Sequence, residues 1–210
     1  YVHTANARPG VNTPSFGGEP IDVDSLTTSF IPPHRHDRLD ELLSGTEDAT
    51  PDDVRSMQLD VLDGVARRWV PELLAGPWEL EDASAQPCRD LLLAWDYRLN
   101  AEGSGGAVWA VFQQALLEEV LSESLSKTEL DMYFQTSGPG DSLFLNPDKD
   151  ALGAETEHVE RALVRTCEQL IDHQGSDPNQ WSWGAMHPMK LGHPFGEQSS
   201  LLSGWNMNEV

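Results

Sequence analysis

The chain lacks the short motifs that mark the common hydrolase and nucleotide sites. No GxSxG motif is present for an α/β-hydrolase serine, no HExxH motif for a zinc protease, and no glycine-rich phosphate loop after a strand. Its two cysteines lie outside any CxxC pattern, which excludes a cysteine-based zinc or redox motif. No run is long and apolar enough to predict a transmembrane helix. Short motifs therefore assign no mechanism.

Basic residues are also scarce, and lysine occurs only at Lys127, Lys149 and Lys190. The sequence has 13 Lys and Arg against 35 Asp and Glu, a formal net charge of −22. Such a surface repels phosphate, so we expect no nucleic-acid partner and no anionic membrane surface. Acidic pairs such as Glu118 and Glu119 are expected to be solvated faces or partners of helix dipoles.

Two interpretations of the charge compete. A high net charge is typical of disorder when hydrophobic residues are few. Here 39% of residues are hydrophobic and seven are tryptophan, which favours a folded core. The alternative is a folded protein adapted to high salt, where screening weakens the repulsion between carboxylates. We therefore expect a high-salt environment and a domain that loses structure at low ionic strength.

The best delimited helix begins at Thr50, a predicted N-cap, with Pro51 at the first helical position and Asp53 at the capping-box position. The helical spacing of apolar residues predicts that it continues to about Leu74. These residues are Val54, Met57, Val61, Val65, Trp69 and Leu73.

Other helices are expected along most of the chain. Apolar periodicity and breaker residues predict helices over residues 35–43, from Ser84 or Gln86 to about 99, and over 107–125, 128–134 and 155–173. Gly103-Ser104-Gly105-Gly106 is expected to be a flexible connection between two of them. Cys88 and Cys167 fall in helical segments and are expected to be small buried residues. The sequence neither requires nor excludes a disulfide between them.

The two ends of the chain differ from its middle. Residues 1–4 and the Trp181–Trp183 alternation predict short strands, with both indole rings on one face in the second. The predicted fold is mainly α, with a strand and long loop over 1–31, a helical block over 32–174, and a Trp/His/Pro-rich connection and tail over 175–210. Helices between terminal strands are typical of an insertion within a sheet, so we expect a piece of a longer polypeptide without a recognisable signal peptide.

The stretch over 181–196, WSWGAMHPMKLGHPFG, is the least ordinary in the chain. Its tryptophans favour a buried aromatic connection, and its Pro and Gly residues exclude a long helix. Two alternatives are a ligand or partner surface, and a metal site through His187 and His193. Two histidines without a third ligand at a recognisable spacing are weak evidence for zinc.

Three blocks in order resemble the β chain of the penicillin acylase family of N-terminal-nucleophile hydrolases. The resemblance covers essentially the whole chain. The blocks are YVHTANARP at 1–9, then PPHRHDRLDELL at 32–43 with TPDDVRSMQLDV at 50–61 and LLLAWDY at 91–97, and finally WSWGAMHPMKLGHPFG at 181–196.

The resemblance implies a mechanism and a fold. The fold would be the helical segment of an αββα hydrolase β chain. In the family, a serine at the mature β-chain N-terminus attacks the amide carbonyl and its own α-amine is the base. The resemblance assigns Asn6 to the oxyanion hole and Arg38 to positioning that Asn and the nucleophile amine. Arg35, three residues earlier on the same predicted helix, competes for the second role.

The resemblance also implies calcium in the intact parent, with Asp24 as the candidate ligand in this chain and Asp22 in the same interval. Partners would be the remaining α and β segments and a small-molecule amide substrate. Penicillin, cephalosporin and lactone substrates are not distinguished, although the family points to antibiotic biosynthesis. Tyr1 is not a nucleophile, so we expect this fragment to be inactive alone.

Two expectations concern the parent protein. The parent is expected to be extracellular or in the cell envelope, although nothing in the fragment itself indicates a location. The alternative to an enzyme is a non-enzymatic helical structural or interaction module of a halophilic protein.

Overall fold

A computed structural model describes residues 34–74, 80–136 and 153–188. Within these ranges the chain is mainly α-helical, which confirms the expected fold class, and the extended pairing is confined to one isolated bridge between Leu62 and Arg98. The α-helices are α1 (His34–Ser44), α2 (Pro51–Gln58), α3 (Gly64–Leu74), α4 (Gln86–Ala94), α5 (Ser104–Leu121), α6 (Lys127–Thr136), α7 (Thr156–Gln174) and α8 (Trp183–Met186). Short 3-10 turns, η2 (Ala83–Ala85) and η4 (Pro178–Gln180), precede α4 and α8.

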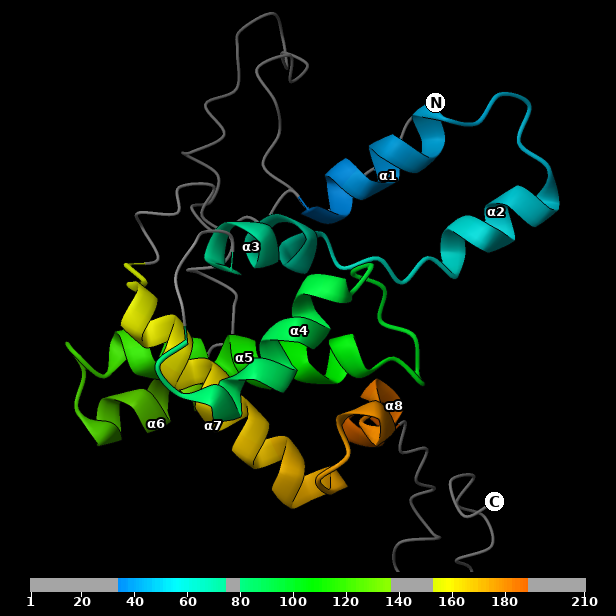
Figure 1. The fold of residues 1–210 in the computed structure, drawn as a ribbon. Helices are drawn as coiled ribbons and strands as arrows, with labels where there is room; N and C mark the ends of the chain where they lie inside the picture. The colour runs from blue at the N-terminus through cyan, green and yellow to red at the C-terminus, as the bar shows by residue number, and fades with distance from the viewer. Residues whose placement is uncertain (1–33, 75–79, 137–152, 189–210) are drawn as a thin grey trace, which may run out of the picture.

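Helices α5 and α7 pack against each other at the centre of the molecule (Figure 1). Ten residues of α5 are buried, including Trp109 and Phe112, because this helix is apolar on most of its circumference. Helix α7 is apolar on one side only and turns that side, with Leu163 and Leu170, to the core. Helix α4 packs on both, and α3 packs on α4.

Cys88 of α4 and Cys167 of α7 form a disulfide with a Cα–Cα distance of 5.9 Å. Both residues are buried in helices, as the sequence predicts. The pairing itself was left open by the sequence, because the two residues are 79 positions apart and meet only when α4 packs on α7.

The helix predicted from Thr50 to Leu74 is wrong in its length, although its start is confirmed. Thr50 caps α2 with a capping box to Asp53, but α2 ends at Gln58 and α3 begins at Gly64. Between them, backbone groups bond to a distant segment: Asp63 N donates to Tyr97 O at 2.8 Å, and Leu99 N donates to Val61 O at 3.0 Å. These bonds replace the helical ones, so the helix is interrupted despite its apolar periodicity.

The expectation that Gly103 to Gly106 form a flexible connection is also wrong. Gly103 is the N-cap of α5, and Ser104, Gly105 and Gly106 belong to its first turn. A Cβ on Gly105 would lie 2.3 Å from Cγ of Trp95, so only glycine lets the first turn of α5 approach that indole. The glycines therefore permit close packing. The preceding helix, predicted to continue to about residue 99, ends at Ala94, and Trp95 lies against Gly105.

The strand predicted at Trp181–Trp183 is wrong. Trp183 is the first residue of α8, and Ser182 caps that helix by accepting the backbone N–H of Ala185 at 3.3 Å. Trp181 is buried while Trp183 is half-buried. The predicted packing role is confirmed for Trp181. The strand expected at 1–4 and the rest of the 181–196 stretch beyond Pro188 lie outside the described residues.

Helices α1 and α2 extend to one side of the core (Figure 1). Neither contains a buried residue, and α1 packs on α3. In the ranges described, none of the helices combines the length and hydropathy needed to cross a bilayer. Side-chain hydrogen bonds of Arg38 and Glu41 tie α1 to Asp60 and to α3.

Candidate functional site

Arg38 of α1 makes a two-point ion pair with Asp60, which lies in the connection between α2 and α3. Nε donates to Oδ2 at 2.7 Å and Nη2 donates to Oδ1 at 3.0 Å. This parallel arrangement suits the planar guanidinium and fixes its orientation as well as its distance. The Asp60 side chain is only 8% exposed, and that of Arg38 is 22% exposed.

Asp60 is itself held by the segment around Arg98. Nη2 of Arg98 donates to Oδ1 of Asp60 at 3.1 Å, and Arg98 pairs through its backbone with Leu62. The hydrogen bond from Arg38 lowers the pKa of the Asp60 carboxyl below its ordinary value, against the opposing effect of its burial. Asp60 is therefore an ionised acceptor fixed on the core side of α1.

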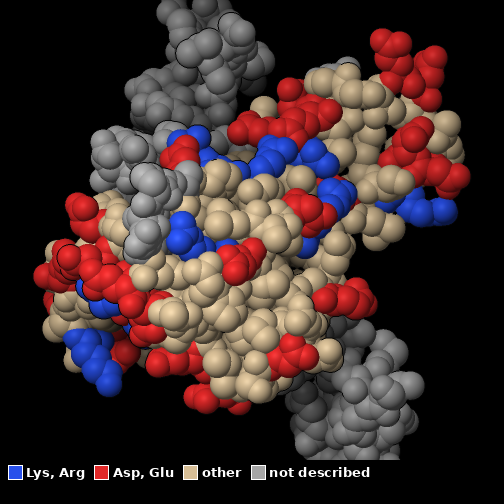
Figure 2. Space-filling view, in the orientation of Figure 1, with Lys and Arg blue, Asp and Glu red and all other residues tan. Residues whose placement is uncertain are grey.

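Glu41 links Arg38 to α3. Its carboxylate accepts from Nη1 of Arg38 at 2.8 Å and from Nη2 of Arg67 at 2.6 Å. We call Arg38, Glu41, Asp60, Arg67 and Arg98 the Arg38 cluster. With every member ionised it carries a net charge of +1 in a chain of −22. Figure 2 shows basic side chains gathered where α1 meets α3, on a face that is otherwise rich in Asp and Glu.

The Arg38 guanidinium retains donors for further partners. Of its five N–H groups, three bond to Asp60 and Glu41 within the described part of the chain. The hydrogen bonds that Arg38 donates to Asp60, first, and to Glu41 raise the pKa of Arg38 further above its ordinary value. Arg38 is thus a permanently charged, oriented donor, and two of its N–H groups have no acceptor among the described residues.

Arg35 lies one turn earlier on α1 and is exposed. Arg38 is held on two sides, which is what a positioning role requires, but the assignment of that role to Arg38 stays a prediction. Asn6, Asp22, Asp24 and His193 lie outside the described residues, so the oxyanion and calcium roles also stay predictions.

His187 is exposed, and its ring stacks on that of Trp183 at 5.0 Å between centroids. Among the described residues, no group of three or more His, Cys, Asp or Glu side chains is arranged to hold a metal ion. Of the two histidines in the alternative metal site, His187 is the one among the described residues, and it takes part in an aromatic stack.

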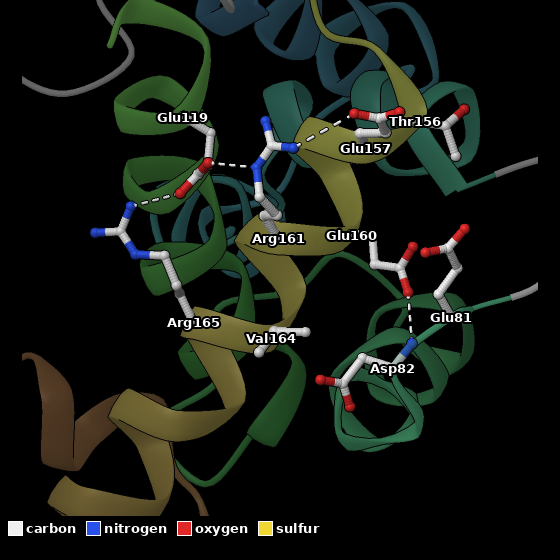
Figure 3. Close-up of a pocket in the computed structure, with 9 residues that line it drawn as sticks. All are labelled: Glu81, Asp82, Glu119, Thr156, Glu157, Glu160, Arg161, Val164 and Arg165. Atoms are coloured by element: carbon white, nitrogen blue, oxygen red, sulfur yellow. Dashed lines mark hydrogen bonds and ion pairs between the residues drawn. The ribbon is translucent and has the colours of Figure 1, made fainter.

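A hollow lies between η2, α5 and α7, away from the Arg38 cluster (Figure 3). Its volume is about 640 Å³, and its described lining is Glu81, Asp82, Glu119, Thr156, Glu157, Glu160, Arg161, Val164 and Arg165. Nothing in the sequence pattern indicated it, because its two walls are distant in the chain.

Glu119 of α5 makes two ion pairs in this hollow. Its carboxylate accepts from Nε of Arg161 at 2.8 Å and from Nη1 of Arg165 at 2.8 Å, while Glu118 accepts from Nη2 of Arg165. The Glu119 side chain is only 15% exposed and that of Glu118 is 28% exposed, and both pair with arginines of α7, so the expectation that they form a solvated face or pair with a helix dipole is wrong. The described lining contains no His, Cys or Lys to pair with a nucleophile, and the arrangement clamps α5 to α7.

Comparison with known proteins identifies the family of the chain. The family model described as penicillin amidase matches residues 1–210, so the chain belongs to the penicillin amidase family. This membership relates the chain to amide hydrolases and confirms the family indicated by the three sequence blocks. A search of curated proteins finds no match.

The Arg38 cluster should make stability fall in acid. Hydrogen bonds from Arg67, first, and from Arg38 lower the pKa of Glu41 from 4.5 to about 2. Because the folded pKa is the lower one, this stabilisation is present above pH 4.5 and is lost as the pH falls towards 2. In thermal unfolding followed by circular dichroism, we expect Glu41→Gln to flatten the decrease in Tm over this range.

The control for this measurement is Glu47→Gln, which removes an exposed carboxylate from the loop after α1. It should keep the acid slope of the wild type. Equal slopes for Glu41→Gln and the wild type would show that the ion pairs to Arg38 and Arg67 contribute nothing.

Proposed function

We propose that this chain is part of an amidohydrolase that cleaves the acyl amide bond of penicillin-like or other N-acyl substrates. The observation that carries the proposal is that a chain of this family holds Arg38 in one orientation against Asp60, with two N–H groups left for other acceptors. An arginine that orients other groups needs both features. The nucleophilic serine is proposed to come from outside these 210 residues.

The proposed reaction is acyl transfer to an N-terminal serine. The serine oxygen attacks the amide carbonyl while the α-amine of the same residue takes the proton. The negative oxygen of the tetrahedral intermediate accepts an N–H from Asn6, whose amide stays neutral at any working pH. The α-amine then returns the proton to the leaving amine, and water hydrolyses the acyl-enzyme. Arg38 is proposed to hold Asn6 and the amine in place.

The test is an amide hydrolysis assay on the full-length protein that contains this chain, beside the 210-residue chain alone. Penicillins, cephalosporins and N-acyl-homoserine lactones are offered as substrates, since the family does not distinguish them. We expect turnover by the full-length protein and none by the isolated chain. Asn6→Ala should lower kcat by about 10²- to 10³-fold, as expected for loss of one oxyanion donor.

Arg38→Ala should also lower kcat, while Arg55→Ala, which breaks an exposed ion pair of α2 with Asp52, should not. A full-length protein that hydrolyses none of the three classes would overturn the proposal and favour the helical interaction module. Turnover by the isolated chain that Asn6→Ala abolishes would show that no outside nucleophile is needed.

We also propose that the protein folds in an oxidising compartment, in line with the expected extracellular or cell-envelope location. The support is the Cys88–Cys167 disulfide, a bond that persists outside the reducing cytosol. Calcium binding through Asp24 remains part of the proposal for the intact protein.

A further inference from the structure

The carboxylate that faces Arg38 is placed by contacts from another part of the chain. Asp60 is 22 residues from Arg38 and belongs to the interruption between α2 and α3 that the sequence pattern did not predict. We propose that Asp60 is a positioning residue that sets the orientation of the Arg38 guanidinium for the hydrolase reaction. This inference rests on the proposed function.

Asp60 constrains Arg38 more strongly than Glu41 does. A two-point contact from Nε and Nη2 stops the guanidinium plane from rotating, whereas Glu41 contacts Arg38 through one nitrogen. Glu41 also lies on the same helix, three residues away, and is 42% exposed. It therefore moves with Arg38, while Asp60 ties Arg38 to a different segment.

That segment is tied to the core. Val61 and Asp63, on either side of the Leu62–Arg98 bridge, bond through their backbones to Leu99 and Tyr97. The Asp63 carboxylate accepts Nε1–H of Trp109 of α5 at 3.2 Å. Trp109 is 2% exposed, so a continuous set of contacts runs from the central helix to Asp60 and on to Arg38.

The charge and the symmetry of the carboxylate both matter at this place. Each oxygen of Asp60 accepts from Arg38, and Oδ1 also accepts from Arg98. An asparagine has one acceptor oxygen and one NH2 group, so one guanidinium N–H would face another donor. Asp60→Asn should therefore release one of the two points that hold Arg38 while keeping the size of the side chain.

The experiment measures kcat, KM and Tm for full-length variants on the substrate that the wild type hydrolyses. We expect Asp60→Asn to lower kcat by about 10²-fold, the effect of a displacement of about 1 Å in an active site, with KM changed by less than about threefold. Asp60→Glu, which keeps the charge and both oxygens, should recover part of the lost kcat. The matched control is Asp52→Asn, which removes a carboxylate from the exposed pair with Arg55 on α2 and should leave kcat unchanged.

The outcomes separate this inference from the proposed function. If Arg38→Ala lowers kcat and Asp60→Asn does not, Asp60 has no positioning role and the proposed function stands. If Arg38→Ala hydrolyses as the wild type does, the proposed role of Arg38 fails first. If Asp60→Asn lowers the yield of folded protein but its kcat per folded molecule equals the wild-type value, Asp60 is structural only. If Asp60→Asn does not fold, Asp60→Glu decides: a lower kcat at unchanged Tm supports the inference, and an unchanged kcat overturns it.

Discussion

Replacing Cys88 and Cys167 with alanine should lower the free energy of unfolding by about 4 to 5 kcal/mol, since the bond closes a loop across 79 positions of the unfolded chain. The loop spans all of α5 and α6, and the bond joins α4 to α7 where the two helices pack together. Total stabilities of single domains are about 5 to 15 kcal/mol, so this one bond is a large fraction.

Urea unfolding followed by circular dichroism measures this difference, with and without a reducing agent. The reducing agent should destabilise the wild type and leave the Cys88→Ala/Cys167→Ala protein unaffected, which makes the double variant its own control. Both sulfurs are buried, so full reduction is expected only with partial unfolding. Identical unfolding midpoints for the two proteins under non-reducing conditions would show that the disulfide does not form or does not stabilise.

Trp181→Ala should cost about 3 to 5 kcal/mol, the range for removing a fully buried large aromatic. The Trp181 side chain is 1% exposed, and its Nε1–H donates to Gly175 O at 2.8 Å. Its backbone O accepts the hydroxyl of Ser104, the first residue of α5, at 2.7 Å. Removing the indole leaves a cavity, and the Gly175 carbonyl just after α7 loses its hydrogen bond.

Trp183→Ala is the matched control for this change. The Trp183 ring is half-buried and stacks on the exposed His187, so its removal should cost about 1 kcal/mol, within the range for an aromatic pair. Chemical denaturation of the two variants beside the wild type makes the comparison. Equal losses would contradict the assignment of the packing role to Trp181 alone.

Local features of the fold could be predicted because they depend on neighbours in the sequence. The Thr50 cap needs only Pro51 and Asp53, and α7 follows from the spacing of apolar residues over one face. The same periodicity misled at 59–63, where Val61 to Asp63 pair through their backbones with residues 97–99 instead of continuing α2. Periodicity reports which side of a segment is apolar, and it does not report a competing partner from elsewhere in the chain.

The candidate site divides in the same way. Arg38 could be named because it lies in a block that resembles the family, within a short predicted helix. Asp60 could not be named, because many carboxylates in this acidic chain are within a plausible sequence distance of Arg38. Its selection depends on the turn between α2 and α3 and on Arg98, a residue 38 positions further on.

By itself the sequence determined the family, the helical class and the capped start of α2, because these depend on motifs and on contacts within a few residues. Only the tertiary structure decided the Cys88–Cys167 bond, the approach of Gly105 to Trp95 and the pairing of Arg38 with Asp60. Each of these joins residues brought together by helix packing or by a turn that a distant segment stabilises. A linear pattern of residue types contains no information about which of several equivalent partners packing will select.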